Sequence, residues 1–174
     1  IARLVIKGWT LDFASQAGSN LEADLWQRDF RINAIALQVK PDLRLIDPLR
    51  GLEDVTSKQL VVVREANLVA DPLRLMRALR LMAELNLFLA PQTRTFINTY
   101  SHLLSKTSPE RIQAELKRIV SVNDAEEAIT ILKESGLLAP WNNTKQDFLE
   151  KKRISQVSKI FSKEELSLAL PLVR

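Results

Sequence analysis

The chain has 174 residues, 46% of them hydrophobic and 26% charged, which is an ordinary balance for a globular protein. It contains no cysteine and a single histidine, so disulfides, thiolate metal sites and histidine-cluster metal sites are excluded. No apolar run approaches the ~18 residues of a membrane-spanning helix, and the net charge of +4 is compatible with a polyanionic partner.

Short extended segments alternate with loops in the first third of the chain. Residues 3–14 are rich in β-branched and aromatic side chains, which predicts extended chain. Ser19 followed by Glu22 fits a capping box, which predicts a short helix over residues 21–30. The apolar residues 32–39 could turn from helix into strand.

Turn-forming residues continue this mixed pattern. The turn at 40–44 separates two apolar runs and predicts a β-hairpin. An Asp-Pro pair and Gly51 predict a loop over residues 47–55, in which the glycine supplies the left-handed position. Residues 59–64 predict a short strand, and the change to a helical pattern falls near residues 58–70.

From Asp71 onward the pattern is helical. Apolar periodicity and capping residues predict helices over residues 72–85, 91–104, 107–120 and 124–135, the last ending at Gly136. Residues 140–174 are polar and lysine-rich and predict short helices. The expected fold class is therefore mainly α, with an α+β segment at the N-terminus.

A polar cluster interrupts the apolar stretch at residues 24–36. Arg28 and Asp29 are adjacent, and in a helix Asn33 would share a face with Asp29. Such a set can bind a ribose hydroxyl, a phosphate or a backbone group. The alternative is a surface Arg–Asp pair beside an asparagine that caps a turn.

Other charged residues have structural explanations beside their chemical ones. Asp47 and Asp54 flank the loop glycine, and this loop could simply form a turn or could hold Mg²⁺. Asp12, on a predicted strand, could face solvent or lie near bound metals. Glu110, Arg111 and Glu115 fit intrahelical ion pairs, or could brace neighbouring helices.

Asp71 precedes a proline and is expected to cap the helix over residues 72–85. Arg74 lies one turn into that helix, so a carboxylate and a guanidinium would lie side by side. Such a pair offers acceptors and fixed donors that can match the Watson–Crick edge of a base, and capping leaves one carboxylate oxygen for a ligand. Arg77 and Arg80 continue at three-residue steps, and their alternative role is a solvated helix edge.

Four stretches, in their order and spacing, resemble the class II tRNA nucleotidyltransferases (CCA-adding enzymes) and the bacterial poly(A) polymerases. These stretches are LEADLWQRDFRINAIA, IDPLRGLEDV, VADPLRLMRALRLMAELNL and SPERIQAELKRIV. The resemblance covers about residues 10–140. It implies part of a nucleotidyltransferase head over residues 1–62, a helical neck over 63–122 and the start of a helical body over 123–174.

The resemblance implies a role for each matching residue. The residues that would hold the incoming nucleotide are Arg28, Asp29, Asn33, Asp71, Arg74, Arg77 and Arg80. Within this set, Asp71 and Arg74 would read the base edge of CTP or ATP, and the others would face the ribose and phosphates. The residues that match the head–neck loop and the bracing positions of the neck are Asp47, Gly51, Asp54, Glu110 and Arg111. Asp12 matches a position where an accessory carboxylate can occur.

The sequence also departs from the family pattern. Gln27 and Ala70 replace charged residues, Arg31 replaces a threonine and Arg50 a glycine, so we expect altered affinity or selectivity. The Asp-x-Asp segment that binds two Mg²⁺ ions in the family, behind a Gly-Gly-x-x-Arg-Asp loop, is absent from the 174 residues. We therefore expect a piece of a longer protein that is inactive alone, the Mg²⁺ ligands lying outside this chain.

The function implied by the resemblance is Mg²⁺-dependent transfer of CMP or AMP from CTP or ATP to an RNA 3′ end. The partner would be tRNA, the location cytoplasmic, and this chain would supply nucleotide selection and RNA binding. Two alternatives stay open: a poly(A) polymerase-type enzyme, and a non-catalytic RNA- or nucleotide-binding helical module.

Overall fold

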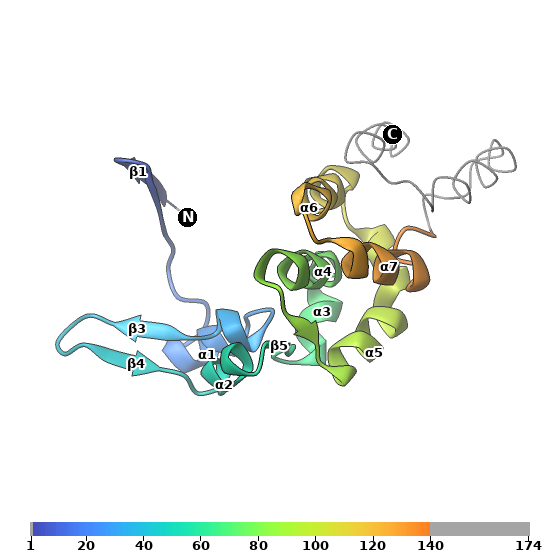
Figure 1. The fold of residues 1–174 in the computed structure, drawn as a ribbon. Helices are drawn as coiled ribbons and strands as arrows, with labels where there is room; N and C mark the ends of the chain where they lie inside the picture. Colours follow the sequence, from blue (N-terminus) through green and yellow to red (C-terminus); the bar gives the residue numbers. More distant parts are fainter. Residues whose placement is uncertain (1, 140–174) are drawn as a thin grey trace, which may run out of the picture.

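The computed structural model describes residues 2–139, so the short helices expected over residues 140–174 lie outside the described residues. Within that range helices predominate, and the strands form only two-stranded pairs. The expected mainly α fold with a mixed N-terminal segment is confirmed (Figure 1). Among the described helices, none is both long and apolar enough to cross a membrane.

The first described element is an antiparallel hairpin, which fits the extended chain expected there. Strand β1 (Ala2–Ile6) pairs with β2 (Trp9–Phe13) around a turn at Lys7 and Gly8, both of which have positive φ. Because side chains alternate along a strand, one face of this hairpin is entirely apolar. Its side chains are exposed, Trp9 to 75%, and the hairpin extends away from the helices (Figure 1).

The short helix α1 (Leu21–Leu25) is half as long as expected and begins differently. Its cap is Asn20, whose side-chain oxygen accepts from the Ala23 amide at 2.8 Å, so the predicted capping box of Ser19 and Glu22 is wrong. The chain then leaves the helix and makes a single 3₁₀ turn, η1 (Arg31–Asn33). The segment between α1 and η1 is therefore a turn rather than a continuous helix.

The hairpin expected around residues 40–44 is confirmed, with β3 (Ala36–Gln38) antiparallel to β4 (Arg44–Ile46). The loop expected over 47–55 is wrong, because most of it forms helix α2 (Gly51–Thr56). The Asp47 carboxylate supplies the missing cap, accepting from the amides of Gly51 at 2.7 Å and Leu52 at 2.9 Å. Sequence reasoning took this aspartate as a turn residue, whereas it starts a helix.

Two elements of the middle region were not expected. The strand expected at 59–64 is only β5 (Gln59–Leu60), and it pairs in parallel with an unpredicted strand, β6 (Phe88–Leu89). An additional helix, α3 (Glu65–Ala70), precedes the predicted helix at 72–85. The change from a mixed to a helical sequence pattern near residues 58–70 therefore falls on β5 and α3.

The remaining helices follow the expected order. Their bounds are α4 (Leu73–Leu85), α5 (Pro91–Tyr100), α6 (Pro109–Ser121) and α7 (Glu126–Glu134). Helix α4 ends at Asn86 in the left-handed conformation, and α7 is followed by Gly136 with φ of 67°. The helix expected to reach residue 104 ends earlier and continues as a 3₁₀ segment, η2 (Ser101–Lys106). Ser108 is the residue before α6, with Pro109 in its first turn.

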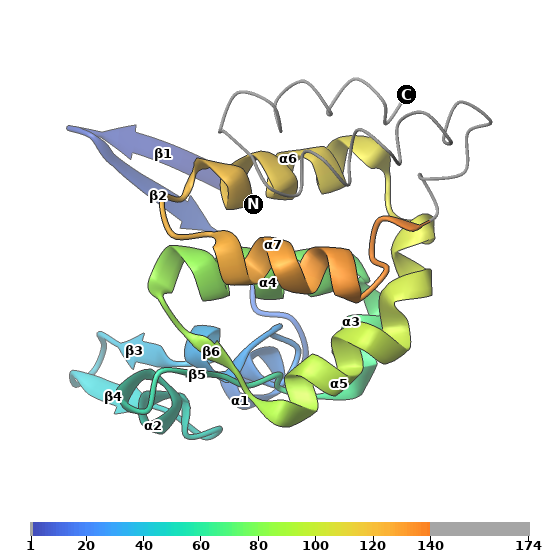
Figure 2. The same cartoon turned by 45° about the vertical axis from the view of Figure 1, so that its right-hand side comes forward.

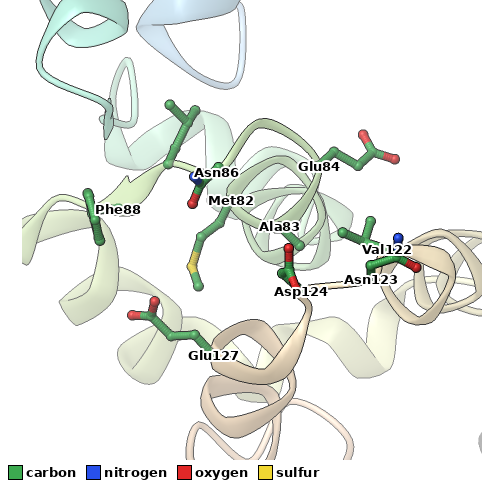
Figure 3. Close-up of a pocket in the computed structure, with 10 residues that line it drawn as sticks. Met82, Ala83, Glu84, Asn86, Phe88, Val122, Asn123, Asp124 and Glu127 are labelled. Atoms are coloured by element: carbon green, nitrogen blue, oxygen red, sulfur yellow. The ribbon is translucent and has the colours of Figure 1, made fainter. Parts of the chain in front are cut away.

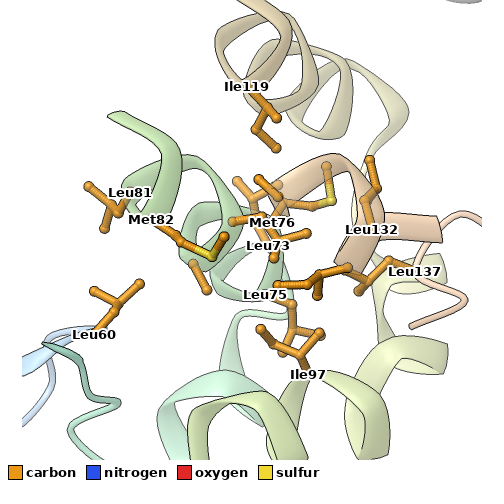
Figure 4. Packing of buried hydrophobic residues seen from close by; sticks show 14 of the residues in the cluster. Leu60, Leu73, Leu75, Met76, Leu81, Met82, Ile97, Ile119, Leu132 and Leu137 are labelled. Carbon is orange, nitrogen blue, oxygen red and sulfur yellow. The ribbon is translucent and has the colours of Figure 1, made fainter. Parts of the chain in front are cut away.

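Helix α4 lies at the centre of the helices and packs against α6 and α7 (Figure 2). Its buried side chains include Leu75, Met76 and Leu79, which lose essentially all exposure. Figure 4 shows Met76, Ile119 and Leu132 converging from α4, α6 and α7. A second, smaller cluster is formed by Leu25, Ala34 and Leu49, and Ala36 of β3 and Ile46 of β4 pack against it. The large cluster fixes α4, and with it the positions of Arg74, Arg77 and Arg80 on that helix.

Candidate functional site

A cleft of about 570 Å³ opens between α4, α6 and the turn that follows α1. It contains all seven residues expected to hold a nucleotide, together with Arg111 from α6. The lining residues are Arg28, Asp29, Asn33, Asp71, Leu73, Arg74, Arg77, Arg80, Leu81 and Arg111. Five arginines and two aspartates line this cleft. Asp24 and Glu115 pair with two of the arginines from outside the lining, so the arginines remain in excess, which favours an anionic ligand.

The turn after α1 is held rigidly against the helices. Phe30 is fully buried and bridges to Val62, while the Arg31 amide donates to the Val61 carbonyl at 3.0 Å. The side chain of Asn67, on α3, donates to the carbonyls of Trp26 and Arg28 at 2.9 and 2.7 Å. This turn therefore presents its polar side chains from a fixed backbone.

Asp29 lies at the floor of the cleft, 6% exposed. One carboxylate oxygen accepts from the Phe30 amide at 2.9 Å and from Asn33 Nδ2 at 3.0 Å. The other accepts from Arg77 Nε at 2.8 Å and Nη2 at 2.5 Å. Burial alone would raise the pKa of Asp29, but the hydrogen bond from Asn33 and the charge of Arg77 hold it below its usual value. The carboxylate is therefore ionised and fully partnered.

Arg28 is held on the other wall of the cleft by a residue that sequence reasoning did not single out. Its Nε and Nη2 donate to one oxygen of Asp24, at 3.0 and 2.5 Å. The amide of Ala17 donates to the other oxygen of Asp24, and this bond and the Arg28 contact lower the pKa of Asp24. The i, i+4 spacing of Asp24 and Arg28 was the available signal.

Asp71 and Arg74 both line the cleft, but they are held by different partners. Asp71 Oδ1 accepts from the Leu73 amide, the first of α4, at 3.3 Å, but the N-cap position is Pro72, so Asp71 lies one residue before the cap position expected for it. Its Oδ2 accepts from Arg111 Nη2 at 3.0 Å. The second oxygen of Asp71 is therefore bonded to Arg111, and it keeps one lone-pair site for a ligand. Arg74 Nη1 donates to the Gln27 carbonyl at 2.9 Å, which anchors its guanidinium on the turn after α1.

Arg80 does not lie on a solvated helix edge, which was the alternative to its expected role in nucleotide binding. Its side chain is 5% exposed, and Nε donates to Glu115 on α6 at 2.6 Å. Its Nη1 donates to Glu84 at 2.7 Å, and Glu84 also pairs with Arg118 of α6. Glu115, expected in an intrahelical pair, instead bridges α6 to α4. Arg80 thus reaches the cleft wall while it ties the two helices together.

The positions expected at the head–neck loop lie outside the cleft, on and before α2. Asp47 caps that helix, and a Cβ on Gly51 would lie 2.2 Å from the Arg31 carbonyl oxygen, so close approach rather than a left-handed conformation requires glycine. It is Arg50 that has the left-handed φ, 61°. Asp54 is buried with one oxygen unpartnered, and burial raises its pKa.

Asp12 and Glu110 also lie away from the cleft. Asp12 pairs with Arg3 across the β1–β2 hairpin at 2.7 Å, and Glu110 is exposed in the first turn of α6. Among residues 2–139, no group of three or more acidic, histidine or cysteine side chains is placed to hold a metal ion. The described residues therefore do not form the implied Mg²⁺ site.

A second cleft of about 360 Å³ lies between the end of α4, β6 and the turn from α6 to α7. Figure 3 shows Glu84, Asp124 and Glu127 around it, with Met82 and Phe88. None of the residues expected to bind a nucleotide lines it. The two clefts therefore have opposite character, since basic side chains dominate one and acidic side chains the other.

Two families match separate parts of the chain. One, described as "Poly A polymerase head domain", matches residues 9–61, and another, described as "Probable RNA and SrmB- binding site of polymerase A", matches residues 86–142. The CC-adding tRNA nucleotidyltransferase of Synechocystis sp. is 40% identical over 141 residues, covering 81% of this chain and 34% of its own length. The A-adding tRNA nucleotidyltransferase of Deinococcus radiodurans is 41% identical over 124 residues, covering 68% of this chain and 28% of its own length.

Solved structures agree with these sequence relatives. The crystal structure of the Bacillus stearothermophilus CCA-adding enzyme in complex with CTP is 33% identical to this chain, with a TM-score of 0.70. The match covers 78% of this chain and 36% of that protein, so the chain spans about a third of the length of its relatives. On these matches in sequence and fold, the chain belongs to the class II tRNA nucleotidyltransferase and poly(A) polymerase family.

Proposed function

We propose that the chain supplies nucleotide selection and RNA binding in an enzyme that transfers CMP or AMP from CTP or ATP to a tRNA 3′ end. One observation carries the proposal. Polar residues from two stretches far apart in sequence line one basic cleft, Arg28, Asp29 and Asn33 from the first and Asp71 and Arg74 from the second. The cytoplasm is the expected location of such an enzyme.

The proposed selectivity follows from the chemistry of the base edges. Cytosine and adenine present an amino donor beside a ring-nitrogen acceptor, whereas uracil and guanine present a carbonyl acceptor beside an N–H donor. A carboxylate only accepts and a guanidinium only donates, so Asp71 and Arg74 complement cytosine and adenine. The same pair would face uracil and guanine with like groups opposed, which disfavours UTP and GTP.

The remaining residues of the cleft suit the sugar and phosphates. Arg28, Arg74 and Arg77 are partly exposed and bring charge to the cleft wall. Asn33 uses its Nδ2 on Asp29, so its Oδ1 can accept from a ribose hydroxyl. Positive charge and fixed donors of this kind are the usual means of binding a triphosphate.

The proposal also assigns the parts of the chain. Residues 1–62 would be part of the head, 63–122 the neck and 123–174 the start of the body, with Glu110 and Arg111 bracing the neck. The family description of residues 86–142 as a probable RNA-binding site supports RNA binding by the neck and body. Contacts of that region would run along the RNA backbone and position the 3′ end.

Equilibrium binding of CTP, ATP, UTP and GTP to the chain tests the selectivity. CTP and ATP should bind more tightly than UTP and GTP, and Arg74→Ala should reduce this preference by roughly 1–3 kcal/mol. Arg94→Ala is a matched control, because Arg94 pairs with Glu134 at the surface outside the cleft. Equal binding of all four nucleotides by the unaltered chain would show that the proposed base reading is wrong.

Incorporation assays separate the proposed enzyme from its alternatives. Labelled CTP and ATP are offered with a tRNA that lacks its 3′ end and with an unrelated RNA. The 174 residues alone should incorporate neither nucleotide, and a longer protein that contains them should extend the tRNA. Poly(A) synthesis on both RNAs would favour the poly(A) polymerase alternative, to which the two family descriptions also point. Absence of transfer by the longer protein would favour a binding module.

A further inference from the structure

The two groups proposed to read the base are oriented by separate parts of the protein. Arg74 is anchored by the Gln27 carbonyl on the turn after α1. Asp71 lies between α3 and α4, and the strongest contact of its carboxylate comes from Arg111 on α6. The acceptor and the donor of the proposed base-reading pair can therefore be disturbed one at a time.

The carboxylate of Asp71 depends on Arg111 for its orientation. Its other hydrogen bond, from the Leu73 amide, measures 3.3 Å, at the long limit for such a bond. The contact from Arg111 is shorter, 3.0 Å, and is assisted by charge. A carboxylate has about four lone-pair sites, so each oxygen of Asp71 keeps one for a ligand while these two donors hold its plane.

We infer that Arg111 is a specificity-determining positioning residue, which orients Asp71 so that the cleft discriminates bases with an amino group from bases with a carbonyl. The inference rests on the proposed function, because it concerns the same base-reading pair. Without Arg111 the carboxylate is held by the long Leu73 bond alone and can rotate away from the base edge. The amino group of cytosine or adenine then loses a fixed acceptor, and the carbonyl of uracil or guanine loses a fixed repulsive neighbour.

A second arginine on the same helix provides a matched control. Arg118 also lies on α6 and also pairs with a carboxylate outside that helix, Glu84, at 2.9 Å. The side chains of Arg111 and Arg118 are 53% and 56% exposed. Glu84 lines the second cleft and not the basic one. If Arg111 only braced α6, its removal and that of Arg118 would have similar effects.

The test measures dissociation constants of all four nucleotides for the chain and for Arg111→Ala, Arg118→Ala and Arg111→Lys, each with its melting temperature. We expect Arg111→Ala to reduce the preference for CTP and ATP over UTP and GTP by about fivefold or more, the lower end of a bidentate base contact. Arg118→Ala should keep the preference of the unaltered chain. Arg111→Lys retains a charged donor for Asp71 and should recover part of the preference.

Each other outcome has a distinct meaning. If Arg111→Ala weakens all four nucleotides equally, Arg111 acts only as a charge near the phosphates, and the inference is overturned. It is also overturned if Arg111→Ala and Arg118→Ala lower the melting temperature alike and leave the preference unchanged. If the unaltered chain shows no preference among the four nucleotides, the proposed function itself fails. Because Arg111 is exposed, its replacements are expected to fold, and the lysine variant provides the comparison if alanine does not.

Discussion

Arg77 and Asp29 form a two-pronged ion pair across the cleft, with Nε and Nη2 both within 2.8 Å of one carboxylate oxygen. The two residues come from α4 and from the turn after α1, so the pair joins the two walls of the site. Asp29 also binds the Phe30 amide and Asn33. Its acceptor sites are filled, so Asp29 positions Arg77 and Asn33 in the cleft rather than accepting a hydrogen bond from a ligand.

Arg77→Ala should destabilise the protein and leave its fold intact. Asp29 would keep its charge at a buried position and lose its only cationic partner among its described contacts. Because the Arg77 side chain is one-third exposed, water can replace part of its effect, and we expect a loss of roughly 1–3 kcal/mol in urea unfolding. Arg94→Ala, at an exposed ion pair, should cost less than about 1 kcal/mol. Equal losses in both variants would contradict this assignment.

The same pair predicts a dependence of stability on pH. The pKa of Asp29 is lowered in the folded state, so its contribution is present above the ordinary aspartate value of about 3.9 and is lost as pH falls through the folded value. Asp29→Asn should therefore be less stable than the unaltered chain at neutral pH, and this difference should shrink as pH falls below about 4. Unfolding free energies measured from pH 7 to 3 test this, and a difference that is constant with pH would exclude it.

Asp54 predicts a dependence of stability on pH that is opposite in sign to that of Asp29. Burial raises its pKa, and its Oδ2 has no hydrogen-bond partner, while Arg31 lies 4.0 Å away. Its contribution to stability is therefore full below the ordinary value and is lost as pH rises through the raised folded value. Asp54→Asn removes the buried charge and should leave stability at pH 7 unchanged or increased. A loss above about 1 kcal/mol would show that the Arg31 contact outweighs the cost of burial.

The elements that sequence reasoning predicted well are those fixed by local chemistry. Helix α4 has strong periodicity and ends at Asn86, and Gly136 marks the end of α7. The elements it missed depend on distant contacts: β6 exists by pairing with β5, and α3 is tied to the turn after α1 through Asn67. A two-residue parallel pair and a single buried amide leave no periodic signal in the sequence.

The candidate site shows the same division. The residues that line the cleft were selected from a motif resemblance, and the structure brings them together. The partners of these residues were not predicted. Arg111 contacts Asp71 and Glu115 contacts Arg80, 40 and 35 residues away in sequence, and ion pairs within α6 explained Arg111 and Glu115 equally well. Arg80 is buried and paired with Glu115, unlike Arg74 and Arg77, and the three-residue spacing of these arginines does not indicate which of them is buried.

The buried pair of Arg80 and Glu115 should be coupled in a double-mutant cycle. Arg80→Met leaves Glu115 buried without its partner and should cost roughly 3–5 kcal/mol. In Arg80→Met with Glu115→Leu both charges are gone and the volume is largely kept, so much of that loss should be recovered. Additive losses, measured by urea unfolding, would mean that the pair contributes little beyond its packing.

Substitutions of two neighbouring residues at the start of α2, Arg50 and Gly51, should change the stability of the protein in opposite directions. Arg50 has φ of 61°, a conformation that costs a residue with a side chain about 1 kcal/mol more than glycine. Arg50→Gly relieves this strain and loses only an exposed pair with Glu53, so we expect a gain of roughly 0.5–1 kcal/mol. Gly51→Ala places a Cβ 2.2 Å from the Arg31 carbonyl oxygen, where backbone must shift, and should lower stability by roughly 1–3 kcal/mol.

The two variants should also differ in nucleotide binding. Arg31 belongs to the 3₁₀ turn that ends at Asn33, so the backbone shift in Gly51→Ala should weaken binding, whereas Arg50→Gly should leave binding unchanged. Thermal unfolding and equilibrium binding of CTP on the two variants measure both effects, and a stable Gly51→Ala with normal binding would show that α2 can move without disturbing the cleft.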